Sequence, residues 1–222
     1  ERVLFRSDAR VYGTEADEIW FSVLRGAKRS IERFHPQTAN RDFSDRAILC
    51  YSDAASVIAS ETPLASVENL DHLEGKEIVI LGDGAQQPNR RVTDGAVLID
   101  PPASKVVLGL PFESLVQPMR LELQMQDGTA QGRRMIGNRL TLRLDNSGGG
   151  EAADDLESGR WEQIEYRTPE DAMDASPPLF TGDKDIILET RHSDSIDAAV
   201  RHTEPLPFTL VAMILKVDVY GN

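Results

Sequence analysis

Two groups of neighbouring carboxylates are the first candidates for a catalytic or ion-binding site in this sequence. Asp183 and Asp185 stand two residues apart, and Asp154-Asp155 lie close to Glu151. A calcium loop needs several oxygen ligands at fixed spacing around a glycine, with a closing glutamate. Neither group has that spacing. We therefore interpret both as solvated loops and keep ion binding as the minor alternative.

Histidine and cysteine, the other common metal ligands, are scattered through the chain. The residues concerned are His35, His72, His192, His202 and Cys50. None has a second histidine or cysteine at metal-clip spacing, and two ligands would not make a site even if His192 and His202 approached across paired strands. We predict ordinary surface or packing histidines. Cys50 lies in the short apolar run 47–51, which favours a buried structural thiol over a nucleophile.

Three further patterns bear on catalysis. Gly82-Asp83-Gly84 follows an apolar run, but no third glycine opens a helix that could hold a phosphate, so we predict a plain turn. Ser114 has no recognisable base and no Gly-x-Ser-x-Gly elbow. Glu162 and Glu165 are the paired carboxylates of the least favoured hypothesis, a hydrolase of cell-wall sugars. We assign no catalytic, cofactor-binding or metal-binding residue and expect no enzyme.

The charge of the chain limits its partners. The 222 residues carry a formal net charge of -13, and the pI is ≈ 4.7. Proteins that bind nucleic acid neutralise phosphates with clustered Lys and Arg, so this balance argues against a general nucleic-acid binder. Basic pairs occur at Arg90-Arg91 and Arg133-Arg134. We expect them to pair with acidic surface on a neighbouring subunit.

Cellular context leaves few marks on the sequence. One cysteine permits no internal disulfide. The longest apolar run, 208–217, is broken by Thr209 and Lys216 and is shorter than the roughly 18 residues of a membrane span. The first residues lack both an initiator Met and the order of a signal peptide. We therefore expect a fragment or a processed product of a longer protein.

Short β-branched runs between turn residues predict a mainly β protein with few or no helices. We expect three parts: strands and a linker at 1–45, a small β-meander or barrel module at 46–119, and an antiparallel β-sandwich-like module at 120–222. The first part contains strands at 10–12 and a hairpin within 18–34.

The module at 46–119 is built around three apolar runs bounded by Gly, Asp or Pro, at 77–81, 96–99 and 105–108. Asp100-Pro101-Pro102 is expected to end the second run, and residues 86–91 are expected to form a loop. Residues 48–60 are interpreted as a strand, with a helix capped by Asp53 as the alternative.

Alternation marks the last module. Leu140, Leu142 and Leu144 share one face of a predicted strand, and residues 121–126 show the same half-buried pattern. Residues 210–215 are apolar on both faces, which predicts a central strand buried on two sides. The segment 147–157, rich in Gly and acidic residues, is predicted to be a mobile loop. Further strands are expected at 161–167, 185–191, 198–202 and 208–220.

Four segments, in this order, carry a resemblance to a known family. They are LDHLEGKEIVILGDG at 70–84, VVLGLPF at 106–112, PLFTGD at 178–183 and PLPFTL at 205–210. Together they resemble the C-terminal part of the tail tubular, or nozzle, proteins of short-tailed bacteriophages. The resemblance spans residues 15–222.

This resemblance implies a structural role. Subunits of that family carry a β-propeller and assemble as a hexameric tube through which the genome leaves the virion. Here the propeller would lie mostly before Glu1, with 19–34 as its last strands. The implied partners are copies of the chain, other tail proteins such as an adaptor, and DNA that passes without sequence-specific binding. The implied location is the virion tail, after assembly in the host cytoplasm.

The rival hypothesis is a carbohydrate- or receptor-binding β-sandwich from a tail fibre or a bacterial surface protein. It requires an exposed aromatic platform, for which the candidates are Trp20, Trp161 and Tyr166. Aromatic residues make up only 6% of the chain, which favours the structural role. A negative lumen also suits a conduit, because attraction would retain the DNA polyanion.

Overall fold

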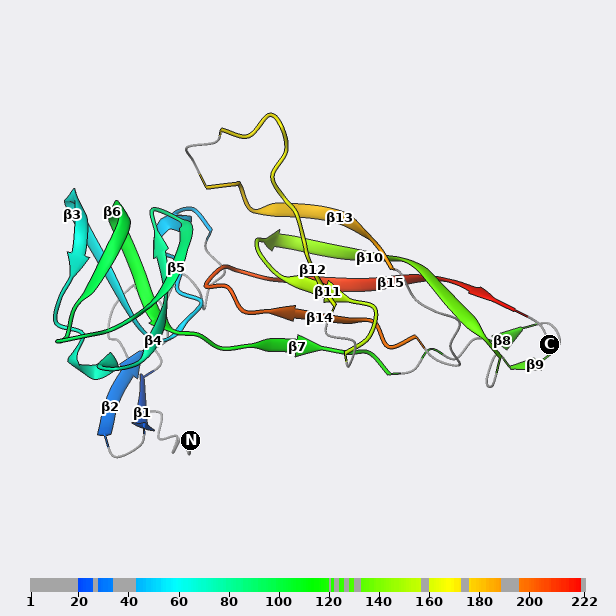
Figure 1. Ribbon diagram of the computed structural model, residues 1–222, viewed down its shortest axis with the longest axis horizontal. Helices are drawn as coiled ribbons and strands as arrows, with labels where there is room; N and C mark the ends of the chain where they lie inside the picture. Colours follow the sequence, from blue (N-terminus) through cyan, green and yellow to red (C-terminus); the bar gives the residue numbers. More distant parts are fainter. Residues whose placement is uncertain are drawn as a thin grey trace, which may run out of the picture. The chain divides into compact units, whose positions relative to one another are not determined.

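The computed structural model describes residues 20–25, 28–33, 43–119, 121, 124–125, 128–129, 133–156, 160–172, 176–188 and 196–220. The chain divides into two compact units, Glu1–Leu110 and Pro111–Asn222. The described regular structure consists of β-strands and two 3-10 turns, without an α-helix (Figure 1). The prediction of a mainly β protein with several antiparallel sheets is confirmed.

The boundary between the units lies before the one predicted after Met119. Strand β7 (Ser114–Val116) pairs with β14 (Ala199–His202), so the segment that follows Pro111 joins the sheets of the second unit. Two prolines, Pro111 and Pro118, flank this short strand in the sequence and hold its neighbours extended.

The first unit is organised around one antiparallel sheet with the strand order β3-β6-β4-β5. Its strands are β3 (Asp53–Val67), β4 (Glu77–Gly82), β5 (Ala85–Arg91) and β6 (Val97–Leu110). Residues 48–60 contain the start of β3, which confirms the strand interpretation and excludes the helix capped by Asp53. The turn η2 (Asp71–Leu73) leads into β4.

Strand β6 runs through the prolines that were expected to end it. The pairing of β6 with β3 shifts register between Leu64 and Ser66, opposite this stretch, so no regular ladder bond is lost at Pro101 and Pro102. Hydrogen bonds from the Gln87 side chain replace the backbone hydrogen bonds between strands at this point. Its Oε1 accepts from the Asp100 amide at 3.1 Å, and its Nε2 donates to the Pro101 carbonyl at 2.7 Å.

Residues 86–91 form most of β5, so the loop expected there is also corrected. Among the described strands, β5 pairs only with β4 and is an edge strand, where a proline is tolerated. Pro88 stands at a register shift between the pairs Ile78–Arg90 and Ile80–Gln87. The sequence AQQPNRR lacks the apolar alternation that predicts a strand. Of its polar side chains only Gln87 is buried.

Both faces of the central strands in this unit are buried. Ile78 and Ile80 of β4 join Val106 and Leu108 of β6 in the main core. The alternate residues Val79, Leu81 and Val107 are buried on the opposite face. The turn η1 (Arg46–Ile48) and buried Leu49 precede β3, and Lys105 Nζ of β6 forms an ion pair with Asp45 at 2.6 Å.

A separate hairpin joins β1 (Trp20–Arg25) to β2 (Lys28–Arg33), which confirms the hairpin predicted within 18–34. The Arg25 guanidinium bonds Glu32 across the hairpin at 2.9 Å and Asp53 of β3 at 2.6 Å. These two carboxylates raise the Arg25 pKa further. The strand expected at 10–12 lies outside the described residues.

The second unit is a sandwich of two antiparallel sheets. One layer has the order β13-β10-β15, and the other has the order β12-β11-β14-β7. The strands not yet bounded are β10 (Met135–Ser147), β11 (Glu151–Ala153), β12 (Trp161–Gln163), β13 (Phe180–Ile187) and β15 (Leu210–Val219). A short hairpin of β8 (Gln124–Met125) and β9 (Gly128–Thr129) precedes them.

The predicted leucine row fills the space between the layers. Leu140, Leu142 and Leu144 are almost fully buried and pack in one cluster with Ala152 and Val200 of the other sheet. The opposite face of β10 is polar. Arg139 and Arg143 point outward there and pair with carboxylates of β13, which is the half-buried pattern expected of an antiparallel layer.

Strand β15 is at an edge of its sheet, which corrects the prediction of a central strand. It pairs only with β10 among the described strands. Val211 is 59% exposed and Ile214 is 48% exposed. An apolar pattern on both faces therefore does not mark burial on both faces here.

Other strand boundaries differ from the predicted ones. Only Gln124–Met125 of the segment 121–126 is described as strand, and residues 122–123 lie outside the described set. β12 ends at Gln163, and β13 begins at Phe180 and ends at Ile187, ahead of 189–191, which are not described.

The Gln87 bridge leads to a first prediction. Gln87→Leu should lower the free energy of unfolding by about 1 kcal/mol, because it leaves the Asp100 amide and the Pro101 carbonyl without their partner at a partly buried site. Gln86→Leu, at the exposed neighbouring position, is the matched control and should change it by less than about 0.5 kcal/mol. Urea unfolding followed by circular dichroism measures both. Equal stabilities of the two variants would contradict the bridge.

Candidate functional site

In the described part of the chain, buried and partly buried polar side chains gather around the corner between β10 and β11, at Gly148–Gly150. The sequence predicts a mobile loop at 147–157, and the described residues 147–156 contradict it, because they include buried residues and strand β11; residue 157 lies outside the described set. Ser147 is fully buried, and its Oγ accepts from the Thr209 amide at 2.8 Å and donates to the Asp145 carbonyl at 3.0 Å. The Gly148 amide donates to the Pro207 carbonyl at 2.9 Å. The corner is thus bound to the segment that precedes β15.

Glycine is required at this corner by conformation and by space. Gly149 and Gly150 have φ values of 70° and 93°, in the region that side chains rarely adopt. A Cβ on Gly150 would stand 2.7 Å from Cε2 of Phe208. The Phe208 ring therefore packs directly on the Gly150 backbone. It also stacks on the His202 ring, with 4.9 Å between the centroids.

Side chains satisfy the polar backbone groups of the corner. His202 Nε2 lies 3.2 Å from the Gly148 carbonyl, and the Tyr166 hydroxyl donates to the Gly149 carbonyl at 2.8 Å. The Glu204 carboxylate accepts from the Gly150 amide at 3.0 Å, and its Oε2 is 3.8 Å from His202 Nε2. We call His202, Glu204, Tyr166 and Phe208 with the three glycines the glycine corner.

Burial is the main cause of the pKa shifts of His202 and Tyr166. It lowers the pKa of His202 more than the Glu204 carboxylate and the Gly148 carbonyl raise it. Burial also raises the pKa of Tyr166 well above its ordinary value, with a smaller contribution from Glu204. The histidine is neutral at pH 7, and its contact with Gly148 indicates that Nε2 carries the proton. These hydrogen bonds link the β10–β11 corner to the segments that carry Tyr166, His202 and Glu204. The imidazole proton is used in the hydrogen bond to the Gly148 carbonyl.

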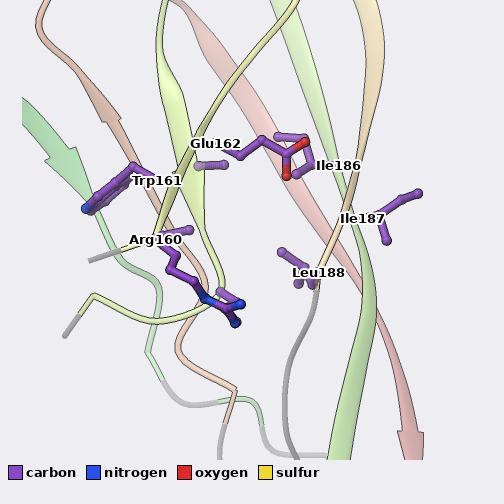
Figure 2. A pocket seen from close by; sticks show the side chains of 9 residues that line it. Arg160, Trp161, Glu162, Ile186, Ile187 and Leu188 are labelled. Carbon is purple, nitrogen blue, oxygen red and sulfur yellow. The ribbon is translucent and has the colours of Figure 1, made fainter. Parts of the chain in front are cut away.

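A small pocket lies elsewhere, at the side of the sandwich where β11 and β12 face β13. Its volume is ≈ 160 Å³, and its walls include Ala152, Ile186 and Leu188. Figure 2 shows the Glu162 carboxylate directed toward Ile186, while the Trp161 ring points to the other side of its strand. Pockets for drug-sized ligands span about 300–1,000 Å³, so this one suits only a small group.

Each of the three aromatic candidates contacts other groups of its own unit. The Arg201 guanidinium covers the Trp161 ring at 4.2 Å and bonds Glu151 at 2.5 Å. The Tyr166 hydroxyl donates a hydrogen bond to the Gly149 carbonyl in the glycine corner. Trp20, in the first unit, is 39% exposed and has the Arg33 guanidinium 5.7 Å from its ring centroid.

The acidic clusters are engaged in ion pairs. Asp183 bonds Arg143 at 2.8 Å, Asp185 bonds Arg139 at 3.1 Å, and Asp154 bonds Arg160 at 3.2 Å. The described part of the chain contains no group of three or more His, Cys, Asp or Glu residues placed to hold a metal ion. His35 and His192 lie outside it. His72 is exposed on η2.

The other residues singled out by sequence have structural or solvent-exposed positions. Gly82-Asp83-Gly84 forms the β4–β5 turn, and the Asp83 carboxylate accepts from the Ser104 and Lys105 amides at 3.0 and 2.8 Å. Burial raises the pKa of the Cys50 thiol, which makes it a poor nucleophile. Exposed positions are held by Ser114, Glu162, Glu165, Arg91 and Arg134. Arg90 approaches Asp100 at 3.9 Å.

Two members of the glycine corner, Glu204 and Phe208, were missed by sequence reasoning. The available signal was the run Ser147-Gly148-Gly149-Gly150, which was attributed to flexibility. In the structure the same glycines permit close packing instead. The described residues also contain no helix that is long and apolar enough to span a bilayer.

The depressed His202 pKa predicts acid sensitivity in a defined window. Below pH 6.5 the unfolded chain takes up a proton at this histidine, whereas the folded chain does so only at lower pH. The free energy of unfolding should therefore fall as the pH drops from 6.5 toward the folded-state pKa. Urea unfolding between pH 7 and 5 measures this slope.

Two variants test the assignment of that slope to His202. His202→Gln, which keeps a donor for the Gly148 carbonyl, should flatten it, and His72→Gln, at an exposed position, should retain it. A slope that persists unchanged in His202→Gln would show that other groups cause it.

No family model matches the chain, and no curated protein sequence matches it.

Proposed function

We propose that this chain is a structural subunit of a phage virion tail, part of the tube or nozzle, which assembles with copies of itself into a channel for genome ejection. The observation that carries the proposal is the apolar edge of strand β15, which pairs only with β10 among the described strands, in a chain with a net charge of -13. An exposed edge of this kind is a template for association. The charge keeps DNA from adhering.

The charge distribution supports the second half of this proposal. Arg25, Arg139, Arg143 and Arg201 each pair with a carboxylate of the same chain. Their positive charge is therefore compensated locally, and the excess of Asp and Glu dominates the long-range field. A polyanion that passes such a surface is repelled without being held.

The segments that resemble tail tubular proteins form the scaffold of each unit. Residues 70–84 supply η2, β4 and the turn held by Asp83, and 106–112 include the buried end of β6. Residues 205–210 bind the glycine corner. These positions support a shared architecture, and they favour assembly over catalysis as the role of the chain.

The rival role in carbohydrate or receptor binding has less support. Trp161 lies under the Arg201 guanidinium, Tyr166 is partly buried in the glycine corner, and the pocket beside Glu162 is small. The hydrolase hypothesis requires a substrate cleft between two carboxylates. Glu162 lines the pocket, and Glu165 is exposed beyond the end of β12.

Two measurements test the proposal. Native mass spectrometry of the chain should show homo-oligomers, and gold-labelled antibodies against it should mark the tail in electron micrographs of the phage that encodes it. Labelling of the capsid shell or of bacterial surfaces alone would refute the tail assignment.

The charge argument makes a separate prediction. The chain should not retard a 5′-labelled DNA duplex in a gel-shift assay at about 0.15 M salt, where exposed charges still act over about 8 Å. Neutralising acidic residues that have no arginine partner, with Glu61→Gln and Glu68→Gln as a first pair, should increase retardation if it changes it at all. Tight binding by the unchanged chain would contradict a conduit role.

A further inference from the structure

The segment 203–208, which we call the strap, connects β14 to β15 and lies outside the described strands. Two hydrogen bonds attach it to the glycine corner. The Gly150 amide donates to Glu204 Oε2 at 3.0 Å, and the Gly148 amide donates to the Pro207 carbonyl at 2.9 Å. The strap therefore depends on a few contacts instead of a ladder of strand hydrogen bonds, as do segments that open while the rest of a domain stays folded.

His202, the last residue of β14, contacts both the strap and the corner. Its ring stacks on Phe208 of the strap, with 4.9 Å between the centroids, and its Nε2 donates to the Gly148 carbonyl at 3.2 Å. The ring is only 6% exposed. Any change in the charge of this ring therefore acts on the strap and on the corner at the same time.

Glu204 is only a partial counter-charge for a protonated His202. Its Oε2 already accepts from the Gly150 amide at 3.0 Å and from the Thr203 amide at 3.3 Å. The same atom lies 3.8 Å from His202 Nε2, which is beyond hydrogen-bond distance. Burial is the larger effect and lowers the pKa of His202. An imidazolium at this site is stabilised when the strap lifts and water reaches the ring.

Among the described groups, Glu204 is the charge that acts on His202. Arg201 and Glu151 pair with each other at 2.5 Å on the opposite face of the layer, because neighbouring residues of a strand point to opposite sides. The other titratable groups on the surrounding elements are Tyr166 after β12, Lys184 of β13 over the Tyr166 and Phe180 rings, and exposed Glu113 before β7. Protonation of His202 is thus opposed by burial and favoured by one neighbouring charge.

Hydrogen bonds just beyond the strap limit how far an opening can extend. Ser147 Oγ accepts from the Thr209 amide at 2.8 Å, and the Asp145 amide donates to the Thr209 carbonyl at 3.1 Å. These bonds use a hydroxyl and backbone groups, so protonation of His202 leaves them in place. β15 begins at the next residue, Leu210, and pairs with β10. The strap can therefore lift between His202 and Thr209 while the leucine row keeps its cover.

We propose that the strap is released by acid: protonation of His202 lifts it from the glycine corner, while the leucine row between the two sheets stays buried. At pH 7 the ring is neutral and the strap is closed. Below about pH 6.5 the open form binds a proton that the closed form does not, so the ratio of open to closed molecules rises by up to about tenfold per pH unit. The rise ends at the pKa of His202 in the closed form. This inference goes beyond the proposed function and does not depend on it.

Amide hydrogen exchange, followed by NMR between pH 7 and 5 and corrected for the intrinsic effect of pH on exchange, tests the release. The Gly148 and Gly150 amides should be less protected than the Leu142 amide at every pH, because they open without unfolding of the whole unit. Their protection should fall by up to about tenfold per pH unit below about pH 6.5. Equal protection of the corner and of Leu142 would overturn the proposal, because the corner would then open only by global unfolding.

Two variants identify the group that senses pH. His202→Gln keeps a donor for the Gly148 carbonyl and removes the titration, so protection of the corner should no longer depend on pH, whereas His72→Gln, at an exposed position, should keep the response. Glu204→Gln keeps an acceptor for the Gly150 amide and removes the charge that favours the imidazolium, so the fall in protection should extend to lower pH. A response that persists in folded His202→Gln, or one that disappears in Glu204→Gln, would overturn the role of His202.

Discussion

Burial of one row of leucines between two sheets holds the second unit together. Leu140, Leu142 and Leu144 lie on a single strand that is paired on both sides, with β13 and with β15. Each buried leucine contributes about 1.5–3 kcal/mol relative to an exposed one. The outward residues of the same strand can then be polar. The other strands of the sandwich pack against this row or pair with β10. The glycine corner follows the end of β10, and β15 lies at the edge of its sheet.

The glycine corner solves a problem that this sandwich creates. β10 belongs to one layer and β11 to the other, so the chain must change layers within a few buried residues. The backbone polar groups of such a turn need partners away from water. His202, Glu204 and Tyr166 supply them, while the absence of side chains lets Phe208 close over the turn. The segment PLPFTL at 205–210 thereby has a physical role in joining the layers.

Local patterns predicted several of the strands. Alternation located β10 and the inward orientation of its leucines, and β-branched runs located β4 and β6. The sequence did not reveal where strands lie within a sheet, because β15 has the composition of a central strand and occupies an edge. It also did not distinguish a flexible glycine run from a packed one. Both properties depend on residues far away in the chain, such as Phe208 against Gly150, and no local pattern reports them.

The pairing of β10 with β15 has a consequence for synthesis of the chain. The contact between Leu144 and Leu210 joins residues far apart in sequence, whereas β4, β5 and β6 of the first unit are nearly consecutive. Distant pairings delay folding, since loop closure costs entropy before any contact forms. On the ribosome, the first unit can therefore fold while the leucine face of β10 still waits for β15. During that interval the nascent chain exposes the apolar face of β10 that is buried in the folded unit.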